Sequence, residues 1–153
     1  MKNVTTKEFC KAHGACREGT RFALNYANMR ECYNALLNGE AGNSSASWAI
    51  WVATKKDVFS ARELRLFAVK CARRVQHLMK DRRSVDALDV AERFANGEAT
   101  EAELRNANDA AAEAANAAAE AARFARSAAY YKEKHEQLKI LSTLGNPFSE
   151  DEE

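Results

Sequence analysis

Cysteine and histidine side chains near the start of the chain have a spacing that could bind a metal ion. Cys10, His13 and Cys16 form a Cys-x-x-His-x-x-Cys pattern, and a fourth ligand from Cys32 or Cys71 would complete a tetrahedral Cys3His zinc site. That fourth cysteine would come from a helix in which it also fits an apolar face. The alternative is that these thiols are small buried side chains, the commoner role of a free cysteine. We expect this second role, with no bound metal.

A second set of chemically active side chains is cationic. Residues 1–83 carry 16 Lys and Arg against 7 Asp and Glu, a net charge of +9, whereas residues 84–153 carry 7 against 15, a net charge of −8. Either the two halves pack together and their charges largely cancel, or one face stays exposed to a partner of opposite charge. The densest positive charge follows one helical face and the turn after it. We predict that a partner binds there, at Arg62, Arg65, Lys70, Arg73, Arg74, Arg82 and Arg83.

The sequence contains no pattern typical of an active site. A Gly-rich phosphate loop and a His-Glu-x-x-His pair are both absent, and no Ser, Asp or Cys is placed so that a nucleophile system with His77 or His135 is evident. Catalytic groups can also be assembled from distant segments, so motifs alone do not decide the question. We predict a protein that is not an enzyme and uses no cofactor.

Helix-capping patterns indicate where these residues are positioned in the first part of the chain. Thr5 or Thr6 begins a short helix that Gly14 ends, and further helices are expected over residues 17–26 and 29–37.

Trp48 and Trp51 follow a small, polar loop and lie three residues apart, on one face of another short helix. They serve either as core anchors or as an exposed contact for a partner.

Capping residues and apolar spacing also predict two helices in the middle of the chain. Ser60 with Glu63 forms a capping box, and apolar residues at helical spacing continue as far as Met79. Ser84 is expected to cap the next helix, which Gly97 ends.

The last expected helix runs from Thr100 to Thr143 and is dominated by alanine. Fourteen of the 23 residues from Ala107 to Ala129 are Ala, and Thr100 with Glu103 forms a capping box. Alternating spacings of four and three produce a seam of methyl groups on which another helix, or a second copy of the chain in a homo-oligomer, could pack closely. The seam residues are Ala107, Ala111, Ala114, Ala118, Ala121, Ala125 and Ala128.

The predicted fold is therefore all-α, a bundle of several short helices packed on one long Ala-rich C-terminal helix. We expect a single helical domain over residues 1–146 and an acidic, disordered tail over residues 147–153. The chain lacks an 18-residue uncharged apolar run and an apolar signal sequence. We therefore expect no membrane partner and a cytoplasmic location, which is the host cytoplasm if a phage encodes the protein.

Several motifs together resemble a known family. They are Ala15-Cys16-x-x-Gly19, Trp48-x-x-Trp51-x-Ala53, Leu64-Arg65-x-Phe67-Ala68-x-x-Cys71-Ala72-x-x-Val75 and Ala91-Glu92-x-x-Ala95-x-Gly97-Glu98-Ala99-Thr100. This ordered set, over roughly residues 15–130, resembles the small alanine-rich helical proteins of bacteria and tailed phages described as immunity proteins. The resemblance implies an all-α fold and a role in conflict between phages and bacteria, and it supplies no catalytic residues.

Two function classes follow from these observations. The first is a non-enzymatic binding protein that neutralises an effector or a host defence protein, such as a nuclease or a CRISPR complex, by protein–protein contact. The second is an accessory protein that binds nucleic acid through the basic helix from Arg62 to Arg83. Salt dependence separates them, because phosphate contacts weaken steeply as salt rises.

Overall fold

The computed structural model describes the backbone of residues 4–119 and 128–149, and the side chains of residues 4–112 and 133–149. All regular elements in these residues are helices, apart from one isolated β-bridge between Thr5 and Asn28. The all-α prediction is confirmed. The elements in chain order are α1 (Thr6–His13), α2 (Arg17–Ala23), α3 (Met29–Leu37), the 3-10 turn η1 (Gly42–Ser44), α4 (Ser45–Ala53), α5 (Ala61–Arg74), the 3-10 turn η2 (Gln76–Leu78), α6 (Arg82–Ala95), α7 (Glu101–Ala119) and α8 (Ala128–Ser142).

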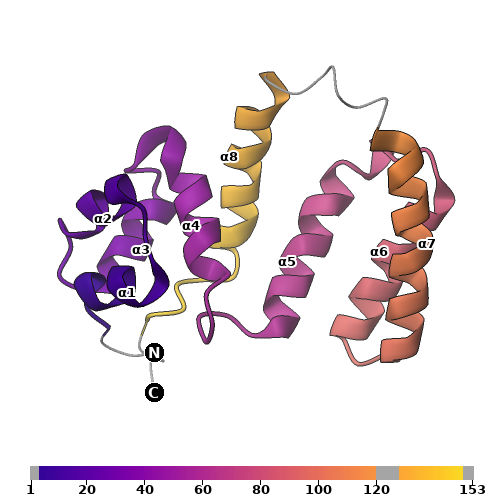
Figure 1. Cartoon of the computed structure of the whole chain (residues 1–153), viewed down its shortest axis with the longest axis horizontal. Helices are drawn as coiled ribbons and strands as arrows, with labels where there is room; N and C mark the ends of the chain where they lie inside the picture. The colour runs from indigo at the N-terminus through magenta and orange to yellow at the C-terminus, as the bar shows by residue number, and fades with distance from the viewer. Residues whose placement is uncertain (1–3, 120–127, 150–153) are drawn as a thin grey trace. The chain divides into compact units, whose positions relative to one another are not determined.

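The chain divides into two compact units. Unit 1 comprises Met1–Ser60 and Tyr131–Glu153, and unit 2 comprises Ala61–Tyr130. In Figure 1, α1 to α4 of unit 1 and α5 to α7 of unit 2 form two groups of helices. That they form one domain over residues 1–146 stays a prediction.

Short polar side chains begin the helices of unit 1. Thr5 caps α1 in a capping box, because the backbone N–H of Glu8 donates to the Thr5 hydroxyl at 3.2 Å and the Glu8 carboxylate accepts from the Thr5 N–H at 3.3 Å. Gly14 ends α1 with a left-handed φ of 64°, as predicted. The predicted bounds of α3 are confirmed, whereas α2 ends at Ala23 and not at Tyr26.

Aromatic rings form the core of unit 1. Phe9 of α1 packs edge-on against Phe148, with ring centroids 5.8 Å apart, and Phe148 packs in the same way against Tyr33 of α3. Tyr33 is fully buried, and Leu141 of α8 is buried as well. The core therefore joins helices from both ends of the sequence.

The segment after α8 is anchored in unit 1. The Asn146 side chain donates to the backbone oxygen of Arg30 at 2.8 Å. Phe148 is only 3% exposed, although it lies in the tail that we expected to be disordered from residue 147. The packed chain thus continues at least to Phe148, while residues 150–153 lie outside the described residues.

In unit 2, α6 packs against both α5 and α7. Asp81 caps α6 by accepting from the Arg83 N–H at 2.9 Å, so the prediction that Ser84 caps this helix is wrong. An aspartate is as good a cap as a serine and adds a negative charge at the positive helix end, and its earlier position lengthens the helix. Arg82 and Arg83 consequently lie in the first turn of α6.

The helix that we expected to continue to Met79 ends at Arg74. After it the chain forms η2, and Leu78 is 68% exposed instead of lying on a buried face. The side chains that are buried in the described part of unit 2 are small, namely Val69, Ala87 and Ala95.

The prediction of one long helix from Thr100 to Thr143 is wrong. The chain has a 19-residue α7 and a last helix, α8, of only 15 residues. The physical reason is that the two parts pack in different units: α7 packs on α6, whereas Leu138 and Leu141 of α8 are buried in unit 1. Uniform helix propensity is a weak determinant compared with such tertiary packing.

The alanine seam is described only at its start. Ala107 and Ala111 of α7 are half-buried, while the seam side chains from Ala114 to Ala128 lie outside the described residues. A search of the described helices finds none with the length and apolar character that crossing a membrane requires.

Candidate functional site

Three of the seven predicted partner-binding residues contact α6 within unit 2. Arg62 donates from Nε to the backbone oxygen of Ala95 at 2.9 Å, and so satisfies a carbonyl at the C-terminal end of α6. The guanidinium of Arg65 lies 4.6 Å from the ring centroid of Phe94, in cation–π geometry. Some of the cationic side chains that the sequence places on an outer helical face therefore form contacts within unit 2.

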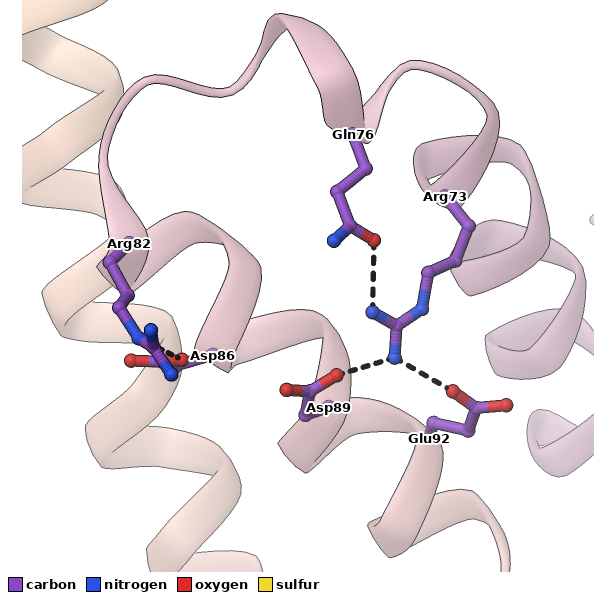
Figure 2. A network of polar contacts seen from close by, with 6 residues as sticks. All are labelled: Arg73, Gln76, Arg82, Asp86, Asp89 and Glu92. Carbon is purple, nitrogen blue, oxygen red and sulfur yellow. Dashed lines mark hydrogen bonds and ion pairs between the residues drawn. The ribbon is translucent and has the colours of Figure 1, made fainter.

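Arg73 is the third of these residues and joins α5 to the acidic side of α6 (Figure 2). One terminal nitrogen donates to Asp89 at 2.5 Å and to Glu92 at 2.9 Å, and the other donates to Gln76 at 3.0 Å. The hydrogen bond to Asp89, and then that to Glu92, raises the pKa of Arg73. These contacts support the interpretation that the basic and acidic parts of the chain pack together, since Arg73 belongs to the first and both carboxylates to the second.

The four remaining predicted residues lie in the second half of α5 or in the first turn of α6. Lys70 and Arg74 are exposed on α5, and Arg82 has 89% of its side chain exposed although it lies 3.5 Å from Asp86. Arg83 donates to Asp81 at 2.7 Å. The side-chain hydrogen bond from Arg83 lowers the pKa of Asp81 to about 2.

Residues 74–83 run from the last residue of α5 into the first turn of α6 and are named here the basic connection. Lys80 and Arg82 are exposed in it, and Leu78 is one of two large hydrophobic side chains that the described residues leave exposed, the other being Leu24 of unit 1. The basic connection therefore combines positive charge with an apolar side chain in the same ten residues. The sequence could not indicate this combination, because the helical spacing of Leu78 predicted that its side chain would lie on a buried face.

The Cys-x-x-His-x-x-Cys pattern does not form a metal site. No group of three His, Cys, Asp or Glu side chains in the described part of the chain is arranged to hold a metal ion. His13 packs against the Phe9 ring, with centroids 4.4 Å apart, and Cys16 caps α2 by accepting from the Gly19 N–H at 3.3 Å. Gly14 ends α1 directly after His13, so Cys10 and His13 of the weak zinc candidate lie in α1 whereas Cys16 lies at the start of α2.

The same cysteines line an apolar pocket in unit 1 that the sequence did not reveal. Its volume is about 380 Å³. Helices α1 to α4 contribute four aromatic rings and three thiols: Phe9, Phe22, Trp48, Trp51, Cys10, Cys16 and Cys32. Gly14 and Cys16 are exposed lining residues, which places the mouth at the connection between α1 and α2.

A sealed void of this size is energetically implausible. At ~24 cal/mol per Å³, a closed empty cavity of about 380 Å³ would cost on the order of 9 kcal/mol. That cost is comparable to the whole stability of a small domain. The feature is therefore best described as a pocket that opens to solvent.

The buried thiols of Cys10 and Cys32 in the pocket are neutral at physiological pH. Burial raises the pKa of Cys32 to about 12, and burial also raises the pKa of Cys10 against the opposing effect of a hydrogen bond with Thr20. A raised pKa favours the protonated thiol, which is a poor nucleophile and a poor metal ligand. The Cys10 and Cys32 side chains consequently act as small apolar surfaces.

The sequence indicated part of this pocket, namely two of its aromatic rings. Trp48 and Trp51 share a face of α4, as predicted, and Phe22 packs against Trp48 with ring centroids 5.6 Å apart. What could not be read from spacing is that Gly19 leaves room beside them: a Cβ atom built there would lie 3.8 Å from Trp48. The missing side chain helps to keep the space open.

No protein-family model, curated protein or solved structure matches this chain significantly. The resemblance to immunity proteins of phages and bacteria thus stays a prediction.

Proposed function

We propose that the protein is a non-enzymatic binding protein that neutralises an effector by protein–protein contact, docking through the basic connection. The observation that carries the proposal is the exposure of Leu78, 68%, beside the exposed cations Lys80 and Arg82. An apolar side chain buried at an interface supplies binding energy, and surrounding charges supply orientation and association rate. The partner surface that fits is an apolar hollow with acidic residues around it.

The resemblance of the sequence to immunity proteins supports the direction of this proposal. The effector would be a toxin or a host defence protein, such as a nuclease or a CRISPR complex. Both are captured by contact alone, so no catalytic group is required of the protein itself.

The test uses two matched pairs of variants. Leu78→Asp removes the apolar side chain of the basic connection, and Leu24→Asp is its control, because Leu24 is exposed to 56% in unit 1. Arg82→Glu reverses a charge in the connection, and Arg105→Glu is its control on α7, where Arg105 is 70% exposed and also pairs with an acidic residue four positions away.

We expect the tagged protein to capture one bacterial protein and to inhibit its activity in a purified assay. Leu78→Asp should weaken both effects at least tenfold, and Arg82→Glu should slow association. Neither control should change them by more than about twofold. Full capture by Leu78→Asp and Arg82→Glu would show that docking occurs elsewhere, and a captured protein that stays fully active would refute neutralisation.

Nucleic-acid binding is the second candidate, because the weak ion pair of Arg82, 3.5 Å long and 89% exposed, leaves its guanidinium accessible to phosphate. It predicts that generic duplex DNA or RNA is retarded at low salt and released as salt rises. Arg82→Glu would then matter more than Leu78→Asp, the reverse of the order expected for a protein partner.

A further inference from the structure

The pocket of unit 1 has the composition of a small-molecule site. Four aromatic rings line it, and two pairs of them are in contact: Phe22 with Trp48 at 5.6 Å, and Phe9 with Trp51 at 6.2 Å between ring centroids. Pockets that bind small molecules are mostly apolar, with few polar groups that fix orientation. Here the polar candidates are the Ser47 hydroxyl and the thiols.

The lining carries no charged side chain among the described residues. Lys55 lies near one of its rings, with Nζ 4.2 Å from the ring centroid of Trp51, but it is not part of the lining. A charged ligand group placed inside would lose its hydration without gaining an ion pair. The site therefore selects against ligands that carry a charge.

The volume limits the size of the ligand. A cavity of ~150 Å³ with an apolar lining accommodates benzene. The pocket, at about 380 Å³, is roughly two and a half times as large and has room for two or three rings. One phenyl-sized side chain of a partner protein would leave more than half of it unfilled.

We infer that this pocket binds an uncharged small molecule with two or three aromatic rings. Such a ligand can pack its faces and edges against the four lining rings at once. The mouth beside Gly14 and Cys16 gives it a route from solvent. This site lies in unit 1 and is independent of docking through the basic connection in unit 2.

Tryptophan fluorescence can be used to follow binding in the pocket, because both tryptophans of the chain line it. The probe is N-phenyl-1-naphthylamine, which is neutral, has three rings and accepts excitation energy from tryptophan. Titration should quench tryptophan emission saturably, with one probe bound per chain. The matched charged probe, 1-anilinonaphthalene-8-sulfonate, has the same rings and one sulfonate, and we expect it to bind at least tenfold more weakly.

Gly19→Leu fills the pocket. A Cβ atom at this position would lie 3.2 Å from the Cys16 sulfur and 3.8 Å from Trp48, so the larger side chain enters the space that a ligand would use. We expect it to weaken binding of the neutral probe at least tenfold. Ala12→Leu, on the exposed side of α1 and outside the lining, is the control and should bind within about twofold of the unmodified chain.

Other outcomes would overturn the inference. Absence of saturable quenching, equal binding of the sulfonated probe, or unchanged binding by Gly19→Leu would each do so. Displacement of the probe by a blocked tryptophan-containing peptide at lower concentration than by naphthalene would assign the pocket to a partner's side chain instead. If Gly19→Leu loses its helical circular-dichroism spectrum, Ser47→Leu, which fills the pocket from α4, decides the question in the same assay.

Discussion

The contacts inside unit 1 differ in kind from the contacts inside unit 2. In unit 1, large side chains such as Phe9, Tyr33 and Phe148 are buried and pack ring against ring. In the described part of unit 2, the buried side chains are one valine and two alanines. Its helices are instead joined by arginines that reach from one helix to the next, such as Arg62 and Arg73.

This difference has an energetic consequence. An aromatic ring buries ~150–250 Å² of surface, and at ~25 cal/mol per Å² each ring contributes several kcal/mol of burial. An alanine buries far less, and a partly exposed hydrogen-bonded ion pair contributes only about 1 kcal/mol. We therefore expect unit 2 to open before unit 1, and to be the unit that responds to pH and salt.

The largest expected effect comes from removing a ring from unit 1. Phe9→Ala should lower the free energy of unfolding by about 3–5 kcal/mol, because it deletes a fully buried side chain and leaves a cavity between α1, α4 and Phe148. Urea denaturation followed by tryptophan fluorescence measures it directly, since both tryptophans lie in unit 1.

Leu24→Ala is the control for this change. Leu24 is 56% exposed, so its truncation should alter the free energy of unfolding by less than about 0.5 kcal/mol. A loss below about 1 kcal/mol for Phe9→Ala would show that the rings of unit 1 are not its main source of stability, and the contrast between the units would disappear.

A smaller effect is expected from the polar link of unit 2. Arg73→Gln should cost about 1 kcal/mol, because it removes two charge-assisted hydrogen bonds from a side chain that is 32% exposed. Arg82→Gln is the matched control from the same region of Figure 2. Its pair with Asp86 is long and largely exposed, so the change should be nearly neutral. Circular dichroism in urea, which reports on helices of both units, is the measurement.

Comparing the Arg73 and Arg82 substitutions tests whether Arg73 holds α5 to α6. Equal effects of the two substitutions would mean that Arg73 does not hold α5 to α6. A loss for Arg73→Gln that rivals that of Phe9→Ala would mean that unit 2 is not the weaker unit.

Local signals explain which parts of the fold could be predicted. The Thr5 and Thr100 capping boxes are both present: the Glu103 N–H donates to the Thr100 hydroxyl at 3.2 Å, and the Glu103 carboxylate accepts from the Thr100 N–H at 2.7 Å. The bounds of α3 and the presence of α4 also follow from neighbouring residues. Each of these features depends on a few consecutive side chains.

The features that could not be predicted depend on a second helix. Arg62 and Arg73 lie on the polar side of α5, and only the position of α6 gives them their hydrogen-bond partners. The alanine tract has no single apolar face with enough area to select a partner, so propensity alone suggested one long helix. The pocket requires α1 to α4 together, and no single motif describes it.

The smallest expected effect concerns pH and the start of α6. The Arg83 hydrogen bond holds the pKa of Asp81 at about 2, below its usual value of 3.8. A carboxyl group whose pKa is lower in the folded state contributes stability that is fully present above pH ~4 and is lost as the pH falls toward 2. Asp81→Asn keeps the size of the capping side chain but removes its charge, so it should destabilise unit 2 slightly at pH 5.

Urea midpoints at pH 5, 4, 3 and 2.5 test this prediction. The difference between the unmodified chain and Asp81→Asn should shrink steadily over that range, because protonation removes the same charge from the unmodified chain. Arg83→Gln removes the partner of Asp81 and should show the same trend. A difference that stays constant down to pH 2.5 would mean that the Asp81 cap stabilises α6 through its shape and not its charge.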